Sequence, residues 1–152
     1  MPRETIELIS AWVTILGLPI TVVTLILAYV AFARSKKIEE ARFWLELREH
    51  FLVHNEVHLN LRNGGKWANS QDGPQSVEEW AKVDAYLGQF ELCELMLEQN
   101  LINKETFKTQ YRYRLHNILQ NQRIVDKLEA TAPSWKLFIS LCASLGFEKI
   151  GA

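Results

Sequence analysis

The sequence has few cysteines, little net charge and none of the common catalytic motifs. Two cysteines allow at most one disulfide, which excludes a disulfide-rich scaffold, and a net charge of −1 gives no sign of a partner that is long nucleic acid. No Walker-type loop, GxGxxG, HExxH, GxSxG or paired CxxC occurs. We therefore predict no enzyme, no catalytic residue, no metal and no cofactor. A content of 48% apolar residues excludes a disordered chain.

Charge is missing altogether from one long segment. Residues Leu8–Ala33 are 26 consecutive uncharged residues, 20 of them apolar. As a helix they measure about 39 Å, more than the roughly 30 Å of a bilayer's hydrocarbon core. Arg34, Lys36 and Lys37 follow directly. The positive-inside rule then predicts a single-span anchor in the inner (cytoplasmic) membrane, with the N-terminus outside and the C-terminal domain in the cytosol.

A cleaved signal peptide is the alternative for this segment. Residues Ala31-Phe32-Ala33 fit a small-x-small cleavage site. The flank before the run is net acidic, however, and the apolar run is longer than an ordinary signal sequence has. Both features favour the anchor.

Small residues in the predicted span repeat at intervals of four and three. Such a repeat lets helices approach closely in lipid and implies a left-handed supercoil. We predict a self-association seam, and hence a homo-oligomer, with chance placement as the alternative. The seam residues are Ser10, Thr14, Gly17, Thr21, Thr24, Ala28 and Ala31.

Glycine and proline are also absent between Pro19 and Gly64, so no local signal ends the helix at the membrane surface. We predict an anchor over residues 1–37, a helical stalk over 38–62 and a cytosolic helical bundle over 63–152. No alternating strand pattern occurs, and the fold class predicted is all-α.

Capping residues mark the helices of the bundle. Ser76 with Glu79 forms a capping-box signature, and Asn100 suits a left-handed C-terminal cap. Asn103 is expected to cap a helix over 104–117 or beyond, with a break near 120–121 and a further helix to about Ala130. The last helix is expected over about 134–145, closed by Gly146.

Three histidines and two cysteines are the remaining candidates for chemistry. His50, His54 and His58 follow i, i+4, i+8 spacing, which suggests a metal strip or a pH response, or otherwise a polar helix face. Cys93 and Cys142 lie in apolar helical stretches, where a thiol is usually a core residue.

Charge is distributed unevenly beyond the basic stop at 34–37. Residues 39–98 carry net −7 and residues 99–152 carry net +4, with aromatic and basic residues interleaved around positions 107–123. Such a stripe suits phosphate contacts and base stacking, so we predict an anion-binding site. The alternatives are that it packs against the acidic helix beginning at Val77 or faces water. The predicted site residues are Lys104, Lys108, Arg112, Arg114, Arg123, Tyr111 and Tyr113.

The order of parts is similar to that of small bacterial single-span proteins with a helical cytosolic domain. Residues 86–95 (YLGQFELCEL) and 97–103 (LEQNLIN) resemble the helix–turn–helix core of such domains. They also resemble the membrane effectors of type III CRISPR systems, in which a cytosolic domain binds cyclic oligoadenylate. The resemblance implies an oligomeric sensor or effector that binds a cyclic oligonucleotide in antiviral defence. The alternative is a membrane-tethered protein-interaction module without a small ligand.

Overall fold

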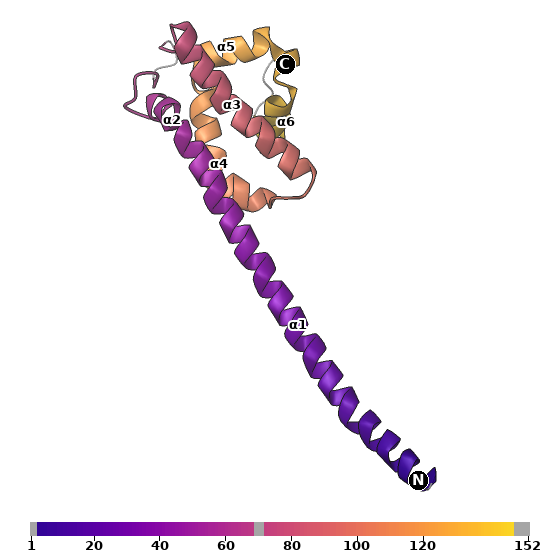
Figure 1. Ribbon diagram of the computed structural model, residues 1–152. Helices are drawn as coiled ribbons and strands as arrows, with labels where there is room; N and C mark the ends of the chain where they lie inside the picture. Colours follow the sequence, from indigo (N-terminus) through magenta and orange to yellow (C-terminus); the bar gives the residue numbers. More distant parts are fainter. Residues whose placement is uncertain (1–2, 69–71, 148–152) are drawn as a thin grey trace. The chain divides into compact units, whose positions relative to one another are not determined.

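The computed structural model describes residues 3–68 and 72–147, with side chains described from residue 21 onward (Figure 1). Every regular element in this part of the chain is helical, which confirms the all-α prediction. Contacts divide the chain into two compact units, residues 1–47 and 48–152. The helices are α1 (Arg3–Val53), α2 (Asn55–Leu61), α3 (Val77–Glu98), α4 (Lys104–Leu119), α5 (Gln122–Ala130), a short 3₁₀ helix η1 (Ala132–Ser134) and α6 (Lys136–Ser144).

The first unit consists of the greater part of α1. The large apolar side chains between Val22 and Phe32 are all exposed, with Tyr29 at 73% and Phe32 at 70%. Among the residues whose placement the structure describes, no helix has a stretch that is both long and apolar enough to cross a membrane. Residues 8–20 of the predicted span, with the seam residues Ser10, Thr14 and Gly17, lie outside the residues whose side chains are described.

The stalk predicted over 38–62 is not one helix. Helix α1 ends at Val53, and α2 begins at Asn55 after a residue, His54, whose ψ of 18° is not helical. The second unit begins at residue 48, whereas we predicted the bundle from residue 63. The second unit begins earlier than predicted because Phe51 and Val57, which precede residue 63, are almost completely buried in it.

Helix ends in the second unit follow the predicted caps. Ser76 Oγ accepts a hydrogen bond from the Glu79 amide, and the Glu79 carboxylate accepts one from the Ser76 amide, so the capping box is formed. Asn103 Oδ1 accepts from the Thr106 amide, 2.9 Å away, and Asn121 caps α5 at the predicted break. Asn100 has a φ of 55°, which confirms its left-handed cap.

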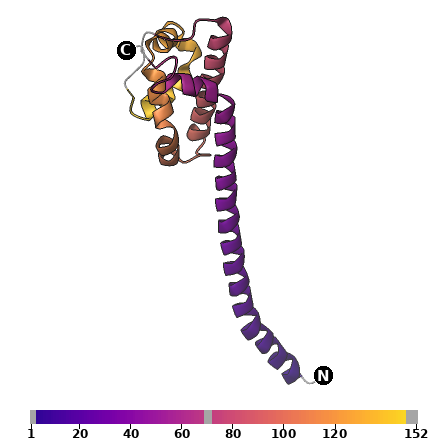
Figure 2. The same ribbon diagram turned by 90° about the vertical axis from the view of Figure 1, so that its left-hand side faces the viewer.

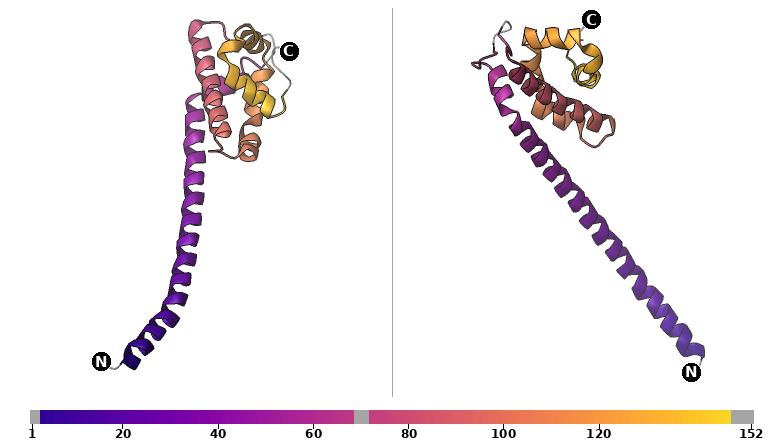
Figure 3. Two further views of the ribbon diagram at one scale, coloured as in Figure 1. Left: turned by 90° about the vertical axis from the view of Figure 1, so that its right-hand side faces the viewer. Right: turned by 45° about the horizontal axis from the view of Figure 1, so that its top comes forward.

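Helix α3 packs along α6 and also contacts α2 (Figure 3). Helix α4 contacts both α2 and α5 (Figure 2). Two ion pairs join α3 to neighbouring helices. Lys82 pairs with Glu56 of α2, and Lys127 of α5 pairs with Asp84.

An aromatic cluster forms the centre of the second unit, and Phe51 lies within it. The Phe51 ring centroid is 4.9 Å from that of Phe90 and 4.6 Å from that of Tyr111, and it meets Tyr86 edge-on at 6.1 Å. Tyr111 in turn stacks on Phe107 at 5.1 Å. Edge-to-face and offset pairs of this kind add to the gain from burial. Residues from α1, α3 and α4 are therefore held together at one point.

Replacing Phe51 tests the importance of this cluster. We expect Phe51→Ala to lower the free energy of unfolding by about 3–5 kcal/mol, because it leaves a cavity among aromatic rings. Val53→Ala is the control, because the Val53 side chain is 78% exposed. It should change stability by no more than about 0.5 kcal/mol. Urea unfolding of the full chain in detergent measures both, and equal effects of the two substitutions would contradict the assignment.

Candidate functional site

Helix α4 has one buried and one exposed face, and its basic residues divide between them. Phe107, Tyr111 and Leu115 are buried in the second unit. Lys104, Arg112 and His116 are exposed, and Lys108 is half-buried. Because residues four apart share a helix face, Lys104, Lys108, Arg112 and His116 form one row along α4.

Three residues of this row, Lys108, Arg112 and His116, line a groove of about 430 Å³, which we call the α4 groove. Its far wall is Phe147, which follows the end of α6. Gly146 adopts a φ of 81° there, and the Phe147 amide donates a hydrogen bond to the Cys142 carbonyl, 3.0 Å away. The Arg112 guanidinium lies over the Phe147 ring at 5.3 Å. The lining residues are Lys108, Thr109, Arg112, Tyr113, His116 and Phe147.

The charges of the described residues that line the α4 groove favour an anion. Among the described residues that line it, none carries a carboxylate. Within the described part of the chain, neither Lys108 nor Arg112 forms an ion pair, whereas Lys127 of α5 is paired with Asp84 of α3. The row therefore does not pack as ion pairs against the acidic α3, which was one alternative. Two unpaired cations beside two aromatic rings can bind phosphate and stack a base.

Two predicted site residues are part of the core instead. Tyr111 is only 4% exposed and Arg114 only 9% exposed. A buried ring cannot stack on an incoming base, so we correct the ligand-binding role predicted for both residues. They face inward because α4 buries its Phe107, Tyr111, Arg114 and Ile118 side in the bundle.

The other predicted residues lie on the surface, but not all in the groove. Lys108, Arg112 and Tyr113 line it. Lys104 lies on the same face of α4, one turn before Lys108, while Arg123 is on α5, beside Gly73. Sequence reasoning missed Phe147 and Thr109. No local spacing links Phe147 to α4, and its one signal is its position after the helix-closing Gly146.

Arg114 forms the centre of a polar cluster behind the groove. Its Nε donates a hydrogen bond to the Tyr113 hydroxyl, 3.1 Å away, and its Nη1 to the Tyr86 hydroxyl, 3.4 Å away. The guanidinium also lies over the Phe51 ring at 5.5 Å. No carboxylate in the described residues pairs with it. Hydroxyl and ring contacts therefore stabilise this buried charge.

His58 packs beside that cluster. Its ring meets the Tyr113 ring edge-on at 5.4 Å, and its Nδ1 is buried without a hydrogen-bond partner in the described structure. Burial, then the positive charges of Arg114 and Arg62, lower the pKa of His58 to about 4. Its imidazole is consequently neutral at neutral pH.

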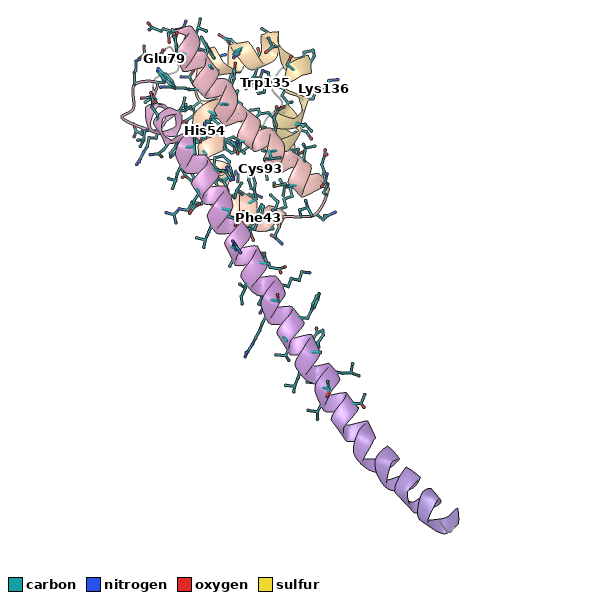
Figure 4. The ribbon with its side chains drawn as sticks, in the orientation of Figure 1. Phe43, His54, Glu79, Cys93, Trp135 and Lys136 are labelled. Atoms are coloured by element: carbon teal, nitrogen blue, oxygen red, sulfur yellow. The ribbon has the colours of Figure 1, made fainter. Side chains whose placement is uncertain are left out.

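The histidine strip does not form a shared metal site in this structure. His50 is exposed on α1, His54 lies at the break before α2 (Figure 4) and His58 is buried. Among the described residues, no three His, Cys, Asp or Glu side chains come together as metal ligands would. The break at His54 interrupts the helical spacing on which the strip depended.

Both cysteines are core residues. Cys93, labelled in Figure 4, and Cys142 are buried free thiols. Burial raises the pKa of Cys93 to about 12, and burial with the nearby Glu94 does the same for Cys142. A thiol nucleophile requires the thiolate form, and both environments oppose it.

The depressed pKa of His58 predicts a loss of stability in acid. A group whose pKa falls from 6.5 to about 4 on folding contributes stability that is complete above pH 6.5 and is lost as the pH falls towards 4. Allowing for solvent screening, we expect the free energy of unfolding to fall about 1–2 kcal/mol further between pH 7 and about pH 4.5 than it does in His58→Gln. Urea unfolding at both pH values measures this, and parallel losses in the two proteins would exclude His58 as the source.

Comparison of the chain with models of protein families, with curated proteins and with solved structures finds no significant match.

Proposed function

We propose that the protein is a membrane-anchored, self-associating sensor whose helical domain binds an anionic nucleotide. The ligand we favour is a cyclic oligonucleotide second messenger of antiviral defence. The observation that carries this proposal is the α4 groove, where Lys108 and Arg112 lie beside the rings of Tyr113 and Phe147 and form no ion pair with any described residue.

The chemistry of the groove matches a nucleotide in two respects. Unpaired cations attract phosphate, and Arg112 offers a planar guanidinium that can bind phosphate oxygens in pairs. Tyr113 is 50% exposed, so its ring is accessible to a base. Stacking on an aromatic ring contributes about 1–3 kcal/mol per base. A ligand with both phosphates and bases uses both sets of contacts.

The apolar surface of α1 supports the proposed anchor. Between Val22 and Phe32 large apolar side chains are exposed around the helix, and Arg34, Lys36 and Lys37 follow. An exposed apolar surface of this extent marks contact with lipid or with another protein. The single span over 8–33, with its N-terminus outside and the bundle in the cytosol, remains our proposal for this segment.

Ligand binding would act on the arrangement of subunits. A ligand shifts such an equilibrium only by its difference in affinity for the two arrangements. Basic grooves from several copies of the chain can surround one symmetric anion. Such a ligand binds the oligomer and stabilises it. Because α1 also self-associates, a ligand that favours one arrangement of the helical domains would favour the corresponding arrangement of the membrane-spanning helices.

A membrane-tethered protein-interaction module is the second candidate. The observation that favours it is the exposure of Leu92 and Leu95 near the end of α3 and of Leu101 just after it. Apolar side chains gathered on a surface are a common sign of a protein partner. In that case capture of the partner should depend on these leucines and not on Arg112.

Titration calorimetry of the full chain in detergent with a series of cyclic oligoadenylates tests the proposed ligand. We expect binding by the native chain and a loss of about ten-fold or more in affinity for Arg112→Glu, because a phosphate contact is replaced by repulsion. Lys136→Glu makes the same charge change on α6, outside the groove, and should leave the affinity within about two-fold.

The controls separate the ligand proposal from a general charge effect. Absence of heat across the whole series would overturn the proposed ligand. An equal loss of affinity in Lys136→Glu and Arg112→Glu would show that the α4 groove is not the binding site.

A further inference from the structure

Two exposed apolar side chains interrupt the charged part of α1 that follows the basic stop. Between residues 34 and 47, Ile38 and Leu45 are the large apolar side chains that lie exposed, at 68% and 62%. They are seven residues apart, so they share a face of the helix with a drift of about 20°. Exposed apolar residues at heptad spacing are typical of a helix that pairs with another helix.

The same heptad continues back into the predicted span. Thr24 and Ala31 occupy the position of Ile38 and Leu45, while Ala28 and Ser35 lie at the second core position. The residue type changes where the chain is proposed to leave the membrane. Small residues allow close helix approach in lipid, and larger apolar residues are needed in water, where their burial drives association.

The flanking charges favour a parallel partner of the same sequence. In a parallel coiled coil with Ile38 and Leu45 at the d positions, Arg34 takes a g position and Glu39 the e position five residues later. These positions face each other across the interface, so Arg34 of one copy meets Glu39 of the other. Arg42, at an a position, is held by Glu46 of its own helix at 3.1 Å. One polar residue at such a position commonly sets the register.

We propose that a second copy of this chain binds along this face of α1, parallel and in register. Ile38 and Leu45 pack against their counterparts in a left-handed coiled coil that continues the seam of Thr21, Thr24 and Ala28. Besides the pairing of Arg34 with Glu39, the parallel direction rests on the proposed anchor, which gives every copy the same orientation. The interface lies within residues 21–45 and does not depend on a ligand in the α4 groove.

Cysteine cross-linking of the full chain in membranes tests this interface. Ile38→Cys and Leu45→Cys each place a thiol in the proposed seam, and Glu40→Cys places an exposed one on the opposite face of the same helix. The native Cys93 and Cys142 are buried and give a low background. Under mild oxidation we expect both seam variants to form covalent dimer several-fold faster than Glu40→Cys.

The outcomes distinguish the interface from the anchor. Equal rates in all three variants, or no dimer at positions 38 and 45, would overturn the proposed coiled coil. Extraction of the same membranes with alkaline carbonate tests the anchor separately. A chain that is released but still cross-links at 38 and 45 supports the interface without the anchor, whereas a chain that is retained without cross-linking contradicts the interface alone.

Discussion

The burial of Phe51 among the rings of Tyr86, Phe90 and Tyr111 is the constraint on which the second unit depends. It joins the last turn of α1 to α3 and α4. It also determines which side of α4 faces inward, because Tyr111 lies on that side. Arg114 follows Tyr111 onto the buried side, and its charge is stabilised by hydroxyl groups and rings.

The exposed cations of α4 follow from the same constraint. Because one side of α4 is buried in the core, Lys108 and Arg112 lie on the other side, where no carboxylate of the described residues pairs with them. The end of α6 then brings Phe147 to this surface. The basic row and the Phe147 ring together line the α4 groove, and the proposed nucleotide ligand rests on this combination of charge and aromatic surface.

Much of the order of helices along the chain was predictable from the sequence, because capping residues close to each helix end determine where the helix begins and ends. Ser76 and Asn103 cap helices where expected, Asn121 lies at the predicted break, and Asn100 adopts its left-handed conformation. Which residues line the site was harder to predict. Aromatic and basic residues alternate so closely along α4 that spacing alone did not separate Tyr111 and Arg114 from Lys108 and Arg112. Phe147 reaches the groove only through tertiary packing, which no local pattern reveals.

The central claim is that the α4 groove holds the bases and phosphates of one ligand. Its most direct test is photolabelling of the full chain in detergent with a cyclic oligoadenylate that carries an azido group on adenine, followed by mapping of the modified peptide. The groove predicts attachment within residues 108–116 or at Phe147, suppressed by excess unlabelled ligand. Attachment confined to α3 or α5, or labelling that unlabelled ligand fails to suppress, would contradict the claim.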